Sequence, residues 1–228
     1  MGGLVSNASN LEICTLLKDG APYGEYLLAA CNEVTNFINI QTKASLEHYV
    51  QADNKEAEHG SVTRLKASGN LLAIGYSSGT VIIYDLDLAN AVPDFDNPEQ
   101  LSLKQLNKFS FHRSGITSII FDSNNTELYT GGQDTYIVVY DLVSDVAQFK
   151  LMGHKEQVTE LALFDLQNPY LKGRAQRILV SSSHDGFLKF WDLEQQRCVH
   201  SHSNELMSKI SSIALVPGLN ALVVGFGT

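Results

Sequence analysis

The sequence has few cysteines, few charged residues and no long hydrophobic run. Its three cysteines, Cys14, Cys31 and Cys198, are an odd number without close spacing, which argues against a disulfide framework or a cysteine-rich metal site. The longest apolar runs reach about eight residues, far below the roughly 20 that a membrane-spanning helix needs, so no membrane partner is expected. Hydrophobic residues make up 44% of the chain and charged residues 18%, a balance typical of a folded protein with a packed core.

Basic residues are also scarce, and the net charge is −9. An acidic chain is not drawn to nucleic acid by its overall field, because phosphate-binding proteins normally carry a basic stripe. Any contact with RNA is therefore expected to be local or to pass through another protein. The sequence has no phosphate-binding loop, no HExxH motif and no Rossmann glycine pattern, so we expect no cofactor and no small-molecule substrate.

What the sequence does contain is a repeat. Residues 71–87 read LLAIGYSSGTVIIYDLD, residues 127–143 read ELYTGGQDTYIVVYDLV, and residues 178–194 read ILVSSSHDGFLKFWDLE. Each has an apolar strand, a tight turn, a second strand with alternating apolar residues, and an aromatic residue followed by Asp and Leu. A supersecondary unit that recurs along a chain defines a repeat architecture. We therefore predict an all-β, WD-repeat β-propeller built from four-stranded antiparallel blades.

The repeat pattern extends to both sides of these stretches. A degenerate blade is predicted upstream, and two strands of a further blade are predicted downstream, at residues 210–216 and 221–226. Because a propeller must close to protect its strand edges, we expect an incomplete N-terminal propeller, with about four and a half blades of a ring of about seven. The expected blade boundaries are approximately 1–50, 51–112, 113–152, 153–202 and, for the partial blade, 203–228.

Four side chains stand where a WD blade builds a buried polar network. In that network the Asp accepts from the His, the His bonds the Ser hydroxyl, and the Ser bonds the Trp indole N–H. Each group offers one directional donor or acceptor, so a satisfied network fixes the geometry of the blade. The predicted network residues are His154, Ser181, Asp185 and Trp191.

The preceding blade repeats this set with Tyr in place of Trp. The corresponding residues are His112, Thr130, Asp134 and Tyr140. In the blade of residues 71–87 the network is broken, because Ile74 and Ser78 replace the Ser and the Asp. These residues indicate the fold and give no information about a ligand.

Two groups of residues could instead indicate a hydrolytic triad or a zinc site. Residues 181–185 read SSSHD and contain the residue types of a hydrolytic triad, but adjacent strand residues point to opposite faces, and no GxSxG elbow accompanies them. Cys198, His200 and His202 alternate, so all three are expected to share one face of an outer strand and could hold zinc. Without a fourth ligand in view, exposed or half-buried strand residues are the favoured interpretation. We expect no enzymatic activity and no metal site.

Two connections are longer than a plain WD repeat needs, at residues 88–103 and 168–176. Both are expected to emerge at the rim that carries the a-to-b and c-to-d turns. The first is flanked or filled by acidic residues: Asp85, Asp87, Asp94, Asp96 and Glu99. The second is basic through Lys172, Arg174 and Arg177. Elaborated surface loops often bind partners, so we predict docking at this rim, with any RNA contact at the three basic residues; solvation alone explains these charges almost as well.

The run from Thr130 to His202 also resembles a particular family. The segments DTYIVVYD, KLMGHKE, SHDG and WDLEQQRCVHSH are similar to motifs in the first propeller of the nucleolar WD-repeat family known as UTP-twelve or WD repeat-containing protein three. His184 replaces a family Lys, and Tyr84 and Tyr140 replace family tryptophans. The second propeller and helical domain of that family have no counterpart in the 228 residues.

The UTP-twelve family supplies UtpB subunits of the small-subunit processome. The resemblance therefore implies a non-catalytic scaffold in the nucleolus that supports 18S rRNA maturation. It implies UtpB-type processome proteins as partners, and precursor ribosomal RNA or guide RNA contacted locally or indirectly. The alternative is a generic WD adaptor in signalling or ubiquitin ligation, and a propeller hydrolase is a distant third.

Overall fold

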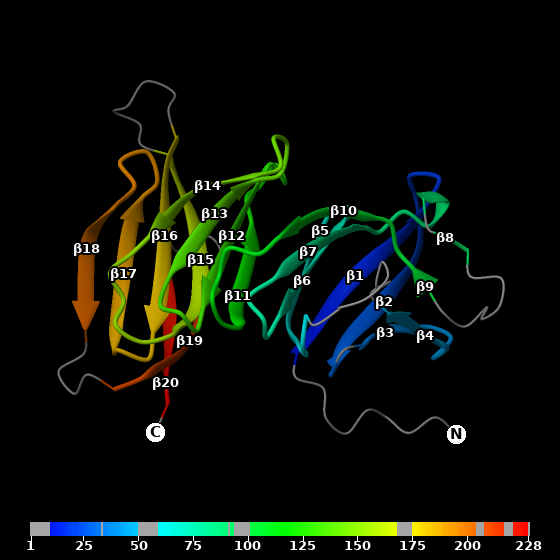
Figure 1. Cartoon of the computed structure of the whole chain (residues 1–228), viewed down its shortest axis with the longest axis horizontal. Coiled ribbons are helices and arrows are strands. Elements are labelled where there is room, and N and C mark those ends of the chain that lie inside the picture. The colour runs from blue at the N-terminus through cyan, green and yellow to red at the C-terminus, as the bar shows by residue number, and fades with distance from the viewer. Residues whose placement is uncertain are drawn as a thin grey trace. The chain divides into compact units, whose positions relative to one another are not determined.

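The computed structural model describes residues 10–32, 34–49, 59–90, 92–93, 101–167, 175–203, 208–216 and 221–227 (Figure 1). The chain divides into two compact units, Met1–Ile116 and Thr117–Thr228, and each is described by itself. Apart from one short 3-10 helix, η1, the regular structure in these ranges is β-strand. Among the described residues, no helix is long and apolar enough to span a membrane.

The first unit contains two four-stranded antiparallel sheets. The first has the strand order β1-β2-β3-β4 and the second the order β5-β6-β7-β10. A short hairpin, β8 with β9, and the helix η1 lie in the connection between β7 and β10. The bounds are β1 Asn10–Lys18, β2 Ala21–Cys31, β3 Val34–Asn39, β4 Ser45–Tyr49, β5 Val62–Ser68, β6 Leu71–Tyr76, β7 Val81–Asp85, η1 Leu88–Asn90, β8 Val92–Pro93, β9 Leu101–Ser102 and β10 Gln105–Phe109.

The second unit contains two more four-stranded sheets and a two-stranded one. Strands β11 to β14 form the third sheet and β15 to β18 the fourth, each in sequence order, and β19 pairs with β20. The bounds are β11 Ile116–Phe121, β12 Glu127–Gly132, β13 Ile137–Asp141, β14 Val146–Leu151, β15 Val158–Gln167, β16 Ala175–Ser183, β17 Phe187–Asp192, β18 Arg197–Ser203, β19 Ile210–Val216 and β20 Ala221–Phe226.

The same irregularity recurs beside the aromatic residue near the end of the third strand. The outer strand carries one extra residue opposite the step into Tyr84 in the second sheet, Tyr140 in the third and Trp191 in the fourth. Such a β-bulge increases the local twist of the strand pair. All three aromatic residues are buried, with at most 3% of their surface exposed. The repeat seen in the sequence is therefore also a repeat of backbone geometry.

The turn between the second and third strands also repeats. Gly79, Thr135 and Gly186 hold equivalent positions and have positive φ angles of 88°, 72° and 81°. Each backbone N–H donates to the carbonyl three residues earlier, which closes the turn. Glycine adopts this left-handed conformation without a steric penalty, whereas a β-branched residue such as Thr135 is strained there.

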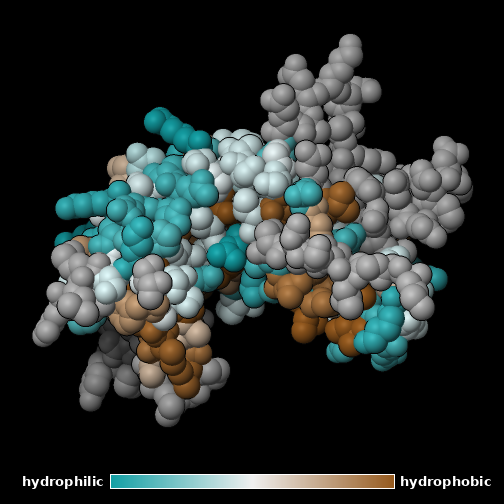
Figure 2. Space-filling model, turned by 90° about the horizontal axis from the view of Figure 1, so that it is seen from below, coloured by the Kyte–Doolittle hydropathy of each residue, from teal (hydrophilic) through white to brown (hydrophobic). Residues whose placement is uncertain are grey.

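Apolar side chains pack between neighbouring sheets within each unit. In the first unit, Leu16, Leu28 and Phe37 of the first sheet join Leu72 and Ile74 of the second in one buried cluster. In the second unit, one cluster lies between the third and fourth sheets, and another joins the fourth sheet to β19 and β20. On the face seen in Figure 2, hydrophilic residues cover much of the described surface and hydrophobic residues gather in separate groups.

The predicted all-β fold class and the strands of the three clear repeats are confirmed, with three local differences. The repeat template places the outer strand of the second blade at residues 108–112, whereas the structure has it at Gln105–Phe109. The connection of residues 88–103 contains η1 and the β8–β9 hairpin. The strands β15 and β16 are longer than expected, so Ala175 and Gln176 belong to β16 rather than to a loop.

Candidate functional site

A continuous chain of hydrogen bonds links four side chains in the fourth sheet. Trp191 Nε1 donates to Ser181 Oγ at 2.8 Å, Ser181 Oγ lies 2.7 Å from His154 Nε2, and His154 Nδ1 lies 3.0 Å from Asp185 Oδ2. An indole N–H only donates and an ionised carboxylate only accepts. In this arrangement the Ser181 hydroxyl donates to His154 Nε2, and the His154 Nδ1–H donates to Asp185. Every polar group of these four side chains therefore has a hydrogen-bond partner.

The strand register explains why these residues meet. Leu179 pairs with Trp191 across β16 and β17, so Ser181, two residues further along β16, lies on the same face. His154 comes just before β15, and Gly153 lets it approach: a Cβ at Gly153 would lie 3.2 Å from Trp191 Cη2. The backbone N–H of Phe187 fixes Asp185 in the turn through a 3.0 Å hydrogen bond to Oδ1.

The electrostatics of Asp185 follow from two opposing effects. Burial raises the pKa of its carboxyl, but hydrogen bonds from His154 and from the backbone N–H of Lys155 and Phe187 outweigh burial and lower the pKa to about 2. The carboxylate is therefore ionised at neutral pH. A charged acceptor strengthens its hydrogen bond with His154, which makes this end of the network the most polar.

The order Ser–His–Asp in this chain is also that of a hydrolytic triad, but the surroundings differ. Ser181 has no exposed surface, and its oxygen already accepts the Trp191 indole N–H. A nucleophile needs an open side where a substrate carbonyl can approach. The neighbouring His184 bonds the Gln157 amide at 3.0 Å instead of a serine. In the described fourth sheet, these residues thus build structure rather than present a reactive hydroxyl.

In the third sheet, Thr130, Asp134 and Tyr140 occupy the positions that Ser181, Asp185 and Trp191 have in the fourth. Leu128 pairs with Tyr140, so Thr130 takes the position that Ser181 has in the fourth sheet. Burial raises the pKa of Tyr140, against the lowering effect of a hydrogen bond with Thr130. Asp134 accepts the backbone N–H of Tyr136 in the turn. His112 is buried and belongs to the first unit.

The second sheet has an apolar residue where the network would be. Leu72 pairs with Tyr84, which places Ile74 in the position of Ser181, and Ile74 is completely buried. In the turn, Ser78 bonds Thr80 at 3.1 Å, and Thr80 bonds Ser110 at 3.1 Å. The predicted break at Ile74 and Ser78 is thus filled by packing and by a short chain of hydroxyl groups.

The prediction that Cys198, His200 and His202 share one face is wrong. Cys198 pairs with Trp191 and His200 pairs with Phe190, because the bulge inserts an extra residue between them. Adjacent strand residues point to opposite faces, so Cys198 packs in the cluster of Trp191 while the His200 ring contacts Phe190. No group of three or more metal-ligating side chains occurs among the described residues.

The three residues of the predicted basic loop do not all lie in a loop. Lys172 and Arg174 lie outside the described residues. Arg177 lies in β16, not in a loop, and its guanidinium binds Glu127 through a 2.7 Å contact from Nη1 to Oε2. Burial lowers the pKa of Arg177, but Glu127, Tyr129 and nearby acidic groups outweigh burial and raise it.

Of the predicted acidic residues, three lie outside the described parts of the chain: Asp94, Asp96 and Glu99. Asp87 accepts backbone N–H groups of Asp19, Gly20 and Ala89. These hydrogen bonds, above all the one from Ala89, lower the pKa of its carboxyl. Asp85 accepts the N–H of Asp87. Both described carboxylates therefore organise backbone turns, and the docking of partners at this rim stays a prediction.

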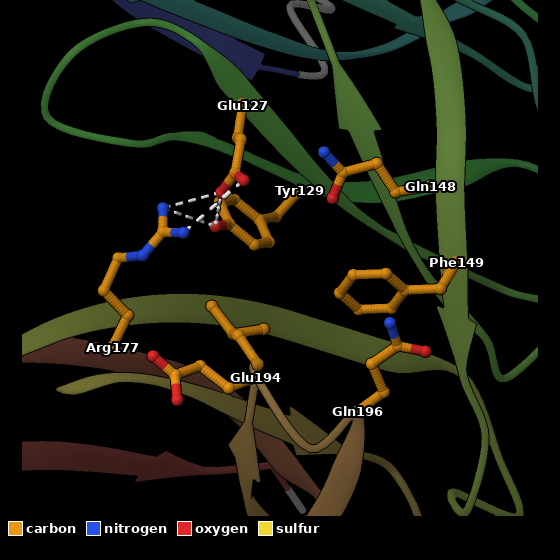
Figure 3. Close-up of a pocket in the computed structure, with 8 residues that line it drawn as sticks. Glu127, Tyr129, Gln148, Phe149, Arg177, Glu194 and Gln196 are labelled. Atoms are coloured by element: carbon orange, nitrogen blue, oxygen red, sulfur yellow. Dashed lines mark hydrogen bonds and ion pairs between the residues drawn. The ribbon is translucent and has the colours of Figure 1, made fainter.

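A groove that the sequence did not reveal lies in the second unit, between the third and fourth sheets (Figure 3). Its volume is about 250 Å³. The lining comes from β12, β14, β16 and the β17–β18 turn: Glu127, Tyr129, Gln148, Phe149, Arg177, Leu193, Glu194 and Gln196. Of these residues, only Arg177 was singled out in the sequence, as part of the basic loop. The others become its neighbours only when the two sheets pack together.

These features define the class of the protein. Repeated four-stranded antiparallel sheets, a bulge at each closing aromatic residue, and a Trp–Ser–His–Asp chain in one of them are those of a WD-repeat β-propeller. The sequence model described as "Nucleolar protein 10-like, N-terminal domain" matches residues 57–225. The chain belongs to this family of N-terminal β-propeller domains.

Comparison with individual proteins gives more distant relationships. The chain is 26% identical over 142 residues to p21-activated protein kinase-interacting protein 1-like of Xenopus laevis, covering 62% of this chain and 32% of that protein. It is 33% identical over 110 residues to small ribosomal subunit protein RACK1 of Schizosaccharomyces pombe, covering 45% and 31%. It is 31% identical over 153 residues to U3 small nucleolar RNA-associated protein 12 of Saccharomyces cerevisiae, covering 66% and 14%. The chain thus spans less than a third of these relatives.

A solved structure supports the fold. The computationally designed protein Ika8 superposes with a TM-score of 0.65 and 20% sequence identity, covering 98% of this chain and 57% of that chain. At this identity the similarity concerns the fold alone.

Proposed function

We propose that this chain is a non-catalytic scaffold of ribosome biogenesis, acting in the nucleolus to assemble the small-subunit processome on precursor ribosomal RNA. The observation that carries the proposal is the match of residues 57–225 to the nucleolar protein 10-like family. The similarity to U3 small nucleolar RNA-associated protein 12 supports the same setting. A fold alone does not determine function, so the proposal needs a direct test.

The charge of the chain supports contact with proteins over contact with nucleic acid. The net charge is −9, and Arg177, one of the three basic residues expected at RNA, is paired with Glu127. Protein partners, such as UtpB-type processome subunits, would bind the sheet edges and connections. Direct RNA contact is then confined to Lys172 and Arg174, with the rest of the association passing through other proteins.

The proposal is tested by purifying the tagged full-length protein from growing cells and sequencing the RNA that accompanies it. We expect precursor ribosomal RNA and U3-type guide RNA to be enriched, and processome proteins to dominate the co-purified proteins. Enrichment of neither RNA would contradict the proposal.

A variant pair locates the contact. Replacing Lys172 and Arg174 with Gln should reduce RNA recovery. Replacing Lys155, in the turn before β15, and Arg197, at the start of β18, with Gln changes the net charge by the same amount at exposed positions and should leave recovery unchanged. Equal recovery from both variants would exclude the basic loop as an RNA contact and leave only indirect association.

A generic adaptor is the second candidate, favoured by the similarity to a kinase-interacting protein. It predicts a defined signalling or ubiquitin-ligation partner in the same purification, without enrichment of precursor ribosomal RNA. The two functions therefore give opposite results in a single experiment.

A further inference from the structure

The groove between the third and fourth sheets is lined by both polar and apolar side chains. Tyr129 and Leu193 are buried with 0% and 7% of their surface exposed, and both line it. Phe149, which packs against the cluster between these sheets, forms a wall (Figure 3). Gln148, Glu194 and Gln196 are exposed on the surrounding turns and strand. A volume of about 250 Å³ suits one extended side chain rather than a folded ligand.

The Arg177 guanidinium, which carries the positive charge in this groove, is already paired with a carboxylate. Arg177 Nη1 lies 2.7 Å from Glu127 Oε2 and 3.5 Å from the Tyr129 hydroxyl, and Nη2 lies 3.4 Å from Glu127 Oε1. The Tyr129 hydroxyl donates to the same carboxylate. A guanidinium held by a carboxylate in this way has little attraction left for a phosphate or an acidic residue.

Glu194 supplies a second carboxylate to the lining. Its side chain is exposed and makes no hydrogen bond or ion pair with any described residue. With Glu127 and Glu194 opposed by Arg177 alone, the groove carries one excess negative charge. Among the described residues that line the groove, the Glu194 carboxylate is thus not paired with a cation, and it lies across the groove from Phe149 (Figure 3).

This combination matches the shape of a basic side chain. Lys and Arg bury their methylene stems along apolar surface while the charged end stays in a polar setting. Phe149 and Leu193 offer the apolar surface, and an aromatic face also attracts a guanidinium. Glu194 offers the counterion, and the Gln196 amide offers a further acceptor.

We propose that the groove binds an arginine or lysine side chain presented by an extended peptide segment of a protein partner. That cation is complementary in charge to the unpaired Glu194. Such binding goes beyond the proposed scaffold function and does not depend on the nucleolar assignment. RNA is disfavoured because its phosphates would meet the excess negative charge.

The test is an NMR titration of the purified chain with four peptides, acetyl-Ala-Xaa-Ala-amide, in which Xaa is Arg, Lys, Gln or Glu. The Arg and Lys peptides should shift the Leu193 methyl signals and the Gln196 side-chain amide signals in a saturable way. The Gln and Glu peptides, and inorganic phosphate, should leave them unchanged. Absence of shifts with Arg and Lys, or equal shifts with Glu or phosphate, would overturn the proposal.

Matched variants separate this groove from the general acidity of the protein. Glu194→Gln should weaken Arg-peptide binding about threefold, the size expected for an exposed ion pair. Glu156→Gln makes the same charge change at an exposed position in the turn before β15 and should have no effect. If both variants bind the Arg peptide as tightly as the parent chain, the groove is not the binding site.

Discussion

The second and fourth sheets share a strand order and a bulge at the closing aromatic residue, yet they are held together differently. In the fourth sheet, Ser181 accepts from Trp191 and donates to His154, so polar side chains run through the interior. In the second sheet, Ile74 stands in the position of Ser181, and every residue of β7 is buried. One sheet is fixed by directional hydrogen bonds and the other by apolar packing.

The difference shows that the polar network is not required for the sheet to form. Burial of apolar surface gives the sheet its stability, and this term has no preferred direction. Hydrogen bonds add specificity, because a buried donor or acceptor left without its partner is costly. The fourth sheet should therefore be more sensitive than the second to the loss of a single polar group.

The largest expected effect is that of removing His154. His154→Ala leaves the Ser181 hydroxyl and one Asp185 oxygen without their partner and opens a buried space, so the free energy of unfolding should fall by about 3 kcal/mol. Urea denaturation followed by tryptophan fluorescence measures this, because Trp191 is the single tryptophan of the chain.

His59 provides the matched control in the second sheet. It precedes β5, is half-buried, and its ring contacts Tyr76 with a centroid distance of 5.4 Å. His59→Ala should cost less than about 1 kcal/mol, measured by circular dichroism. Equal losses for His154 and His59 would remove the distinction between the sheets.

The next effect concerns the turns. Asp185→Ala should lower the free energy of unfolding by about 1 to 3 kcal/mol, since His154 Nδ1 and two backbone N–H groups lose their acceptor. Ser78→Ala, at the same position of the second sheet, removes an exposed hydroxyl and should cost about 0.5 kcal/mol or less. Chemical denaturation of both variants decides the matter, and a small loss for Asp185→Ala would disprove the role of the network.

The third sheet offers a gain in stability. Thr135 adopts a φ of 72° where the other two turns have glycine, so Thr135→Gly should raise the free energy of unfolding by about 1 kcal/mol. Gly79→Ala is the opposite change: its Cβ would lie 2.6 Å from the carbonyl oxygen of His112, and it should destabilise the first unit. Thermal melts of both variants test the pair; destabilisation by Thr135→Gly would show that the threonine makes compensating contacts.

The last expected effect is a pH dependence. The pKa of Asp185 is about 2 in the folded chain, below its usual value of 3.8, so its ionisation stabilises the fold above about pH 4. This contribution should disappear as the pH falls from about 4 towards about 2. The Asp185→Asn variant lacks this ionisable group and so lacks this pH dependence. The difference in free energy of unfolding between the parent and the variant, measured by urea titration, should therefore shrink as the pH falls over this range. A constant difference would contradict the lowered pKa.

The repeat made the fold predictable, because aromatic residues, turns and alternating strands recur at matching places in the sequence. The meeting of His154, Ser181, Asp185 and Trp191 in the structure follows the same template. What the sequence could not show depends on register. The bulge at Val199 turns Cys198 and His200 to opposite faces, and a period of two residues along the strand gives no sign of it.

The groove was unpredictable for a related reason. Glu127, Phe149, Arg177 and Glu194 come from different strands and turns of two sheets and share no motif. Arg177 looked like part of a basic loop because Lys172 and Arg174 precede it in the sequence. Its ion pair with Glu127 arises only when the sheets pack, and that contact changes a basic position into part of an acidic groove.

The most direct test of the scaffold function is sedimentation of the tagged full-length protein from growing cells through a sucrose gradient. We expect the protein to migrate with large particles that contain precursor ribosomal RNA, and RNase treatment before centrifugation should move it to lighter fractions. A protein that remains in light fractions, with or without RNase, and stays separate from precursor ribosomal RNA would contradict the scaffold function.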